Sequence, residues 1–303
     1  MSSQLLDRPN VSRRILTPPS HAYLLMLGSS LAFATMTTCG HALHDRCDWR
    51  ITAVFRASLA FLFTLIVARS SRVKLVFWKP RTLWMRSLVG SVSMLFTFYA
   101  MKELPVGTLL TLTNTFPIWV TLLAWPVLGE RPSAAFAVAL ASGVVGVYLI
   151  EHPTDGSINP ATLAALFASF CTAIVMLGLH RLRRIESLAI VVHFSGVATV
   201  VCFGYAAYRS YVGDAIDLTA LTRPDTIALL AGVGVFATIG QIAMTRAFGI
   251  GSPQKLAVVG LAQVVFALGF DFAIWGHRLD AASAFGTLLI LAPVAWLLGR
   301  RRS

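Results

Sequence analysis

Long apolar runs alternate with short polar segments along the whole chain. A run of roughly 18 or more apolar residues can cross a hydrocarbon core about 30 Å thick as an α-helix. The pattern therefore predicts an all-α polytopic membrane protein. Ten transmembrane helices are expected, at residues 23–41, 51–68, 87–102, 107–128, 134–150, 161–179, 188–208, 226–245, 254–275 and 282–299.

The composition supports this interpretation. Hydrophobic residues make up 56% of the 303 positions and charged residues 13%, whereas about a quarter of a soluble domain is charged. In a soluble protein the net charge of +12 would suggest a nucleic-acid partner. Here it is better explained by loops that face anionic lipid on one side. The expected partners are therefore the lipid bilayer and a small-molecule substrate, and no nucleic acid.

The order of the basic residues predicts how the chain is threaded. With the N-terminus in the cytoplasm, most of the 25 Lys and Arg residues fall in cytoplasmic segments, as the positive-inside rule requires. The largest group is the connection after the second helix, in which Arg86 is counted as the last loop charge. Nine or eleven helices would place the tail Arg300–Arg302 outside, so ten is the stronger count. Both termini are then cytoplasmic.

The N-terminal segment has an alternative interpretation. Residues 1–22 are polar and carry Arg8, Arg13 and Arg14, and an apolar run follows, so the segment superficially resembles a signal peptide. We keep 23–41 as a membrane helix because its removal would destroy the symmetry of the two halves.

The ten helices divide into five plus five at a turn-rich connector. The expected organisation is a tail (1–22), a first repeat (23–150), an external connector (151–160), a second repeat (161–299) and a tail (300–303). With an odd number of helices per repeat, the second enters the membrane from the opposite side. A faint echo supports the repeat: Ala100-Met101 recurs as Ala243-Met244, and Gly129-Glu130 as Gly276-His277. Such inverted repeats are typical of secondary transporters.

Two charges fall inside predicted helices, Arg56 and Asp271. A charge at mid-membrane costs roughly 2.5–3.5 kcal/mol on insertion scales, so it usually faces a cavity or a partner. Both lie roughly 6–8 Å below the outer face at 1.5 Å per residue. We expect them to pair or to flank a common cavity as a gate or a substrate contact. The alternative is that each side chain snorkels to the interface.

Uncharged residues complete the predicted substrate path. The polar candidates can instead form hydrogen bonds between helices, and the aromatic ones can face lipid or core. The polar candidates are Thr113, Asn114, Gln241 and Gln263, and the aromatic candidates are Phe96, Tyr99 and Trp119. Pro117 lies within the fourth predicted helix, where it is expected to cause a kink and to act as a gate or hinge.

Other functions leave no signature in the sequence. An intramembrane enzyme is disfavoured because no helix carries a GxSxG serine, an HExxH pair or twin carboxylates. A receptor or scaffold is disfavoured by the inverted repeat and by the lack of a soluble domain. No GxxxxGK[ST] loop is present, so a gradient of substrate or protons is the expected drive. The four cysteines form no CxxC pair, and His41 and His44 have no third ligand at metal spacing. No metal and no cofactor is expected.

Three segments resemble the EamA-type exporters of the drug/metabolite transporter superfamily. They are FRASLAFLFTL, the stretch from FTFYAMKELPVGTLL to PVLGERPS, and GVVGVYLI. The resemblance implies ten helices in inverted repeats, the inner membrane of a bacterium, and export of small organic solutes such as amino acids, nucleosides or drug-like metabolites. Glu130, within the signature, is expected to act as a hinge. An uptake permease or exchanger for a nucleoside-like metabolite is the alternative, and the oligomeric state, including a homodimer, stays open.

Overall fold

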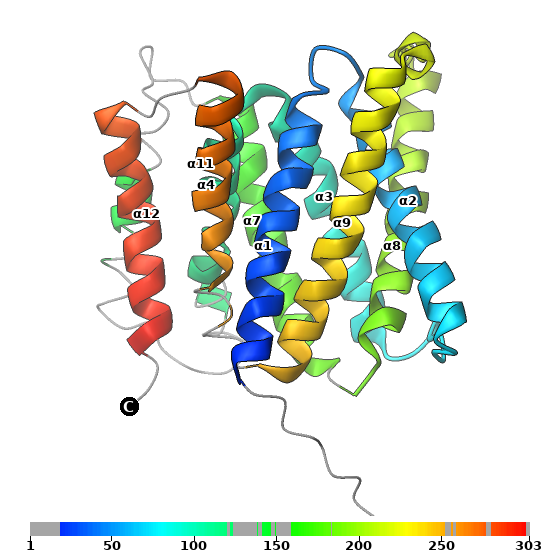
Figure 1. Ribbon diagram of the computed structural model, residues 1–303, viewed down its shortest axis with the longest axis horizontal. Helices are drawn as coiled ribbons and strands as arrows, with labels where there is room; N and C mark the ends of the chain where they lie inside the picture. Colours follow the sequence, from blue (N-terminus) through cyan, green and yellow to red (C-terminus); the bar gives the residue numbers. More distant parts are fainter. Residues whose placement is uncertain are drawn as a thin grey trace, which may run out of the picture.

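In the computed structural model the described part of the protein consists of residues 19–119, 122–123, 138, 141–146, 149, 159–182, 184–251, 256, 259–276 and 280–300. Throughout these ranges the regular elements are helices, which confirms the all-α fold (Figure 1). They are α1 (Pro19–His41), α2 (Trp49–Ser70), α3 (Arg81–Glu103), α4 (Val106–Thr113), α7 (Pro160–Arg181), α8 (Ser187–Tyr211), the 3-10 helix η1 (Thr219–Thr222), α9 (Pro224–Ile250), α11 (Ala262–Trp275) and α12 (Ala281–Arg300).

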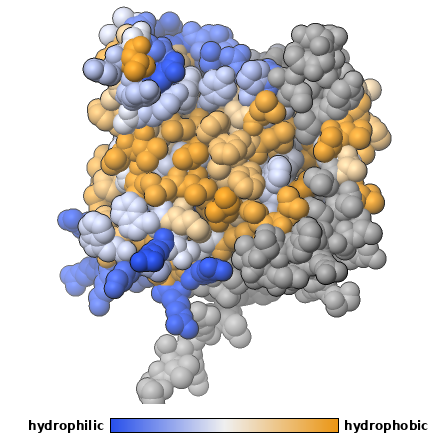
Figure 2. All heavy atoms as spheres, turned by 180° about the vertical axis from the view of Figure 1, so that it is seen from behind, coloured by the Kyte–Doolittle hydropathy of each residue, from blue (hydrophilic) through white to orange (hydrophobic). Residues whose placement is uncertain are grey.

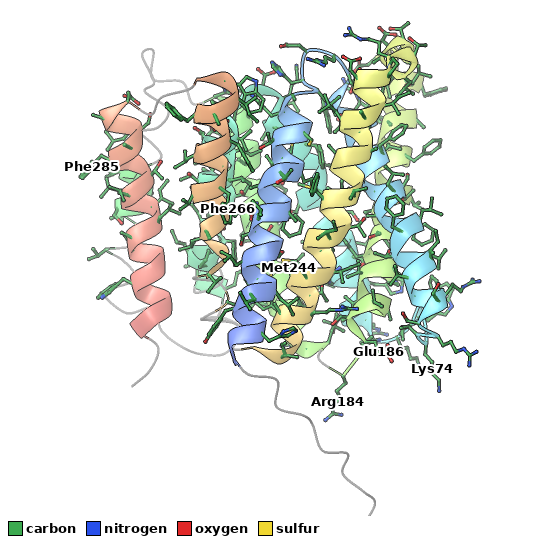
Figure 3. The ribbon with its side chains drawn as sticks, viewed as in Figure 1. Lys74, Arg184, Glu186, Met244, Phe266 and Phe285 are labelled. Atoms are coloured by element: carbon green, nitrogen blue, oxygen red, sulfur yellow. The ribbon has the colours of Figure 1, made fainter. Side chains whose placement is uncertain are left out.

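Length and apolarity agree with a membrane location. Five of the described helices are long and apolar enough to span a bilayer, namely α1, α2, α7, α8 and α9. Figure 2 shows a band of hydrophobic residues across the middle of one face, with hydrophilic residues gathered at both ends. We call the end that holds Lys74 and Arg184 the basic end (Figure 3). A pocket opens at the opposite end, which we call the pocket end. Helix α1 begins and α12 ends at the basic end (Figure 1).

Polar caps fix the starts of α2 and α7 close to the predicted ones. The Asp48 side chain accepts a hydrogen bond from the Arg50 backbone N–H at the start of α2, and Asn159 does the same for Ala161 at the start of α7. Such caps satisfy backbone donors that the helix itself leaves free. These two helices therefore begin where their apolar runs meet polar residues.

The start of α3 was predicted wrongly. The helix begins at Arg81, directly after Pro80, whereas the apolar run begins only at Ser87. Arg86 is therefore a helical residue that is 1% exposed, not a loop charge. Hydropathy did not predict the first residues of α3, because this segment mixes arginines with Leu83, Trp84 and Met85.

The two halves of the chain interleave in opposite directions. Helix α9 packs along α1 with its ends reversed, because Gly232 lies against Cys39 and Gly251 against Ala22. Helix α7 packs along α3 in the same reversed way, with Gly178 beside Met85. The order of helices along the chain matches α1, α2, α3 and α4 of the first half to α7, α8, α9 and α11 of the second. Under this matching, α2 contacts α9 in the same way as its counterpart α8 contacts α3, the counterpart of α9. The described helices therefore form inverted repeats.

Small residues allow the helices to approach closely, as expected in a membrane. A Cβ atom added at Gly234 in α9 would lie 2.5 Å from the Leu59 side chain in α2. A Cβ atom at Gly146 would lie 2.6 Å from the backbone oxygen of Gly286 in α12. The Gly240 backbone oxygen also accepts a 2.8 Å hydrogen bond from the Ser29 hydroxyl in α1. These glycines serve helix packing.

The fourth predicted helix is interrupted just before Pro117, where a kink was expected. Helix α4 ends at Thr113, residues 114–115 form a turn, and helical structure resumes at residues 116–119. Proline has no backbone N–H to donate to the carbonyl four residues earlier, and its ring crowds that turn. The described part of the fourth predicted helix is therefore broken close to its proline.

The connection between α2 and α3 covers the basic end of α8. Val73 and Leu75 pack with Leu188 and Val192 of α8. The Phe77 carbonyl oxygen lies 3.2 Å from Nε2 of His193. We call residues 71–80 the strap, because they join the first half, at the basic end of the molecule, to α8 of the second half.

Candidate substrate path

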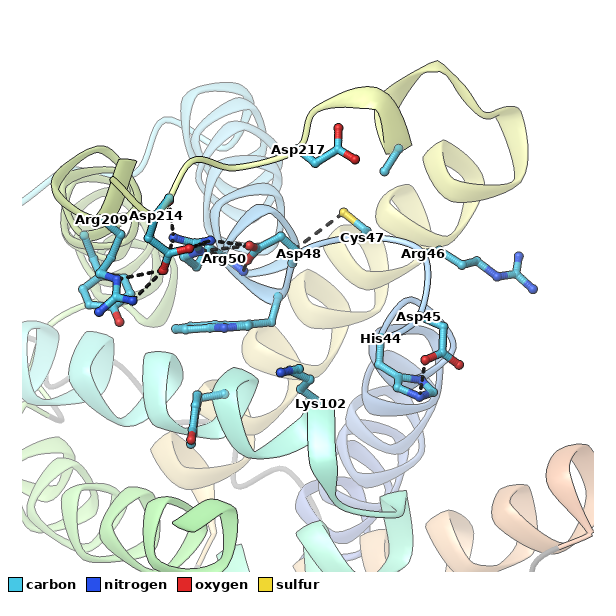
Figure 4. A pocket seen from close by; sticks show the side chains of 14 residues that line it. His44, Asp45, Arg46, Cys47, Asp48, Arg50, Lys102, Arg209, Asp214 and Asp217 are labelled. Atoms are coloured by element: carbon cyan, nitrogen blue, oxygen red, sulfur yellow. Dashed lines mark hydrogen bonds and ion pairs between the residues drawn. The ribbon is translucent and has the colours of Figure 1, made fainter. Parts of the chain in front are cut away.

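A pocket of about 550 Å³ opens at the pocket end, where the two halves meet (Figure 4). Its walls come from the α1–α2 loop, the ends of α3 and α8, and the segment after α8. The lining residues are His44, Asp45, Arg46, Cys47, Asp48, Trp49, Arg50, Tyr99, Lys102, Tyr205, Arg209, Asp214, Asp217 and Ala220.

Ion pairs join the two halves across this pocket. Arg50, at the start of α2, pairs with Asp48 at 2.5 Å and with Asp214 of the second half at 3.2 Å. Arg209 at the end of α8 pairs with the same Asp214 at 2.5 Å. The hydrogen bond from Arg209 lowers the pKa of Asp214, so this carboxylate stays charged at neutral pH. A second contact between the halves joins Arg46 to Asp225 at 2.8 Å.

Three aromatic rings lie beside these ion pairs. The Trp49 ring meets Tyr99 edge-on, with ring centroids 5.8 Å apart, and lies 5.8 Å from the Tyr205 ring. Tyr99 is therefore the predicted path residue that the pocket contains. Nearby, burial raises the pKa of the Cys47 thiol to about 11, so this cysteine is protonated and poorly reactive at neutral pH.

Arg56 lies deeper in the bundle, six positions beyond Arg50 on α2 and so about 9 Å further along the helix axis. Its side chain is 6% exposed. One guanidinium nitrogen, Nη1, contacts the Met94 sulfur at 2.8 Å, and the guanidinium carbon lies 5.5 Å from the centre of the Phe194 ring. In the described part of the chain its Nε has no hydrogen-bond partner.

Arg86 approaches the same ring from α3. Its guanidinium carbon lies 4.7 Å from the Phe194 centroid. Among the described residues, its Nε and Nη1 atoms have no hydrogen-bond partner. Sequence reasoning missed this residue because it assigned Arg86 to a loop. Pro80, which can precede a helix but not continue one, was the signal that the helix starts earlier.

Asp271 does not pair with Arg56, which was one of the two expected arrangements. Its carboxylate, on α11, accepts hydrogen bonds from the backbone N–H groups of Val106 and Gly107, at the start of α4. Arg56 faces α3 and α8 instead. The two charges were expected together because they lie at similar depth, but depth along a helix does not determine which neighbour a side chain faces.

The other predicted path residues are distributed over several helices. Thr113 and Asn114 bond to backbone oxygens of their own helix, at Leu109 and Leu110. The rings of Phe96 and Trp119 meet Phe167 and Phe170 of α7, at 4.7 Å and 5.5 Å respectively. Gln241 is buried in α9 and Gln263 half-buried in α11. Glu130 lies outside the described residues. The part that each plays in transport stays a prediction.

Inverted helical repeats that meet around a polar pocket define a membrane transporter. The chain matches the EamA-like transporter family twice, over residues 20–151 and 159–299. It belongs to this family, as the resemblance of its second to fifth predicted helices suggested.

Relatives extend over most of the chain. It is 27% identical over 249 residues to the pseudopaline exporter CntI of Pseudomonas aeruginosa, covering 80% of this chain and 83% of that one. It is 22% identical over 278 residues to an uncharacterized transporter of Helicobacter pylori, covering 88% and 91%. A crystal structure with a TM-score of 0.65 and 17% identity covers 94% of this chain and 99% of its own, and shows the same fold.

Proposed function

We propose that the protein is a secondary transporter that exports a small organic metabolite by alternating access. The observation that carries this proposal is the polar pocket at the junction of two inverted repeats. Inverted repeats can exchange one packing for its mirror-like partner around a central site. In this exchange, the cross-half pairs Arg46–Asp225 and Arg50–Asp214 form and break at the pocket end.

The proposed location is the inner membrane of a bacterium, with both termini in the cytoplasm. The charges of the two ends support this orientation. Lys74 and Arg184 lie at the end where α1 begins, whereas Asp45, Asp214 and Asp217 lie at the pocket end (Figures 3 and 4). The basic end then faces the cytoplasm, as the positive-inside rule requires.

Export is favoured over uptake by the likeness to a protein named as an exporter. Uptake or exchange of a nucleoside-like metabolite is the second candidate, because the same alternating cycle runs in either direction according to the gradients. Transport, not catalysis, is the proposed activity in both cases.

Counterflow in proteoliposomes tests the proposal. Liposomes that contain the purified protein and an unlabelled amino acid, nucleoside or cationic drug are diluted into the labelled compound. Saturable accumulation above that of protein-free liposomes is expected for at least one class. No accumulation with any of the three classes would contradict the proposal.

A cross-linked variant tests alternating access itself. In a cysteine-free background, Arg46→Cys and Asp225→Cys place one thiol on each half at the pocket end. A short bismaleimide that joins them should abolish counterflow, while each single variant treated alike should keep it. Full counterflow after complete cross-linking would exclude movement of the halves at this end.

A further inference from the structure

We propose that the transported solute carries a carboxylate or phosphate group, which the guanidinium groups of Arg56 and Arg86 bind between α2, α3 and α8. This inference rests on the proposed function and specifies its substrate class. Arg56 and Arg86 come from different helices of the first half, and Phe194 comes from the second half. A solute held here therefore contacts both repeats.

The two guanidinium groups converge on one ring. Their central carbons lie 5.5 Å and 4.7 Å from the centroid of Phe194. Gly90 of α3 makes room for that ring, because a Cβ atom there would lie 2.9 Å from the Phe194 Cε2 atom. The ring therefore attracts two positive groups from different helices, against their mutual repulsion.

Among the described residues, no carboxylate balances the charges of this pair. Both side chains are more than nine-tenths buried, and three of their nitrogens have no hydrogen-bond partner among the described residues. The ion pairs of the described residues include neither arginine. Buried charges are normally paired, since an isolated one costs several kcal/mol. An anionic solute would supply the missing partner.

The chemistry of the free groups narrows the class of ligand. Arginine stays protonated in proteins, and its planar fork of N–H donors matches the two oxygens of a carboxylate or phosphate. Nε and Nη1 of Arg86 have no partner among the described residues, and each offers an N–H donor to one oxygen of such a group. A neutral or cationic solute would leave both charges unbalanced.

The same three helices carry both this pair with its ring and part of the pocket lining. Arg50, Tyr99 and Tyr205 line the pocket on α2, α3 and α8, and further from the pocket end the same helices carry Arg56, Met94 and Phe194. The pocket itself holds acids as well as bases, including Asp45, Asp48, Asp214 and Asp217. Selection for an anion therefore resides at the buried pair rather than at the entrance.

Thermal unfolding of the purified protein in detergent tests the inference with matched probes. The probes are succinate against succinamide, and glycerol 3-phosphate against glycerol, with ionic strength balanced by NaCl. At least one anionic probe should raise the unfolding midpoint saturably, because binding to the folded state stabilises it. The neutral partner of that probe should not.

Variants locate the effect. Arg56→Gln and Arg86→Gln should weaken the apparent affinity for the anionic probe at least tenfold, and the corresponding lysine variants should retain part of it. Lys74→Gln is the matched control, since it removes the same charge at an exposed position of the strap and should leave the affinity unchanged. A midpoint that no anion raises above the NaCl control would overturn the inference, and so would an undiminished shift in both glutamine variants.

Counterflow separates the two proposals. If wild type and both glutamine variants exchange a neutral or cationic solute equally well, the transporter stands and the anion site is rejected. If wild type exchanges nothing while anions still bind at the two arginines, the site stands and the transport proposal fails.

Discussion

Phe194 contacts both buried arginines through the face of one ring. A cation over an aromatic face gains about 2 kcal/mol when water is excluded. Replacement with an aliphatic side chain keeps the apolar contacts but removes the electrostatic part of this attraction. The ring is therefore more than a filler between α3 and α8.

Phe194→Leu is expected to destabilise the protein by about 2 kcal/mol. Chemical unfolding in detergent measures the change. Phe203→Leu on the same helix is the control, because Phe203 is 64% exposed and should tolerate the exchange. Equal losses in the two variants would show that the Phe194 ring contributes only bulk.

Sequence reasoning at the residue scale succeeded where a polar residue interrupts an apolar run. Arg56 stands out in this way and is indeed buried. Arg86 does not, because it borders the run, and hydropathy cannot distinguish the last loop charge from the first helical one. The contact of both arginines with Phe194 could not be predicted either, because nothing in the sequence distinguishes this phenylalanine from the many other apolar residues of the membrane helices.

At the scale of helices, Asp271 ties α11 to the start of α4. The first backbone N–H groups of a helix lack partners within it, and a carboxylate also favours the positive end of the helix dipole. The residue comes from the other half of the chain, so the bond fixes one repeat against the other. Gly107 permits the close approach, because a Cβ there would meet the Leu268 side chain.

Asp271→Ala should lower the free energy of unfolding by about 1–2 kcal/mol, whereas Asp271→Asn should cost less because asparagine also caps helices. Thermal unfolding provides the measurement. Asp280→Ala, at the exposed start of α12, should have a smaller effect. An Asp271→Ala protein of normal stability that has lost transport would instead assign the carboxylate to the transport cycle.

For the molecule as a whole, apolar runs and loop charges were sufficient to predict the fold and the opposite threading of its halves. They could not predict which helices touch. Lateral packing depends on where small residues allow close approach, as Gly234 does against Leu59, and such residues are too frequent in membrane helices to reveal their partners. For the same reason the meeting of α2, α3 and α8 around Phe194 could not be foreseen.

Labelling of single cysteines tests the orientation. In a background without Cys39, Cys47, Cys171 and Cys202, a membrane-impermeant maleimide applied to intact cells should label Asp217→Cys but not Lys74→Cys. Both positions are exposed, so a permeant maleimide should label both. The reverse pattern with the impermeant reagent would place the basic end outside.

The strap gives the two ends of the molecule different physical characters. At the pocket end the halves are held in part by the exposed pair Arg46–Asp225, which dissolved salt screens. At the basic end they are held by Val73 and Leu75 against α8, which salt hardly affects. High ionic strength on the outer side is therefore expected to weaken the contact between the halves at the pocket end and to leave the contact at the basic end unchanged. A saline environment would then favour the conformation in which the pocket end is open.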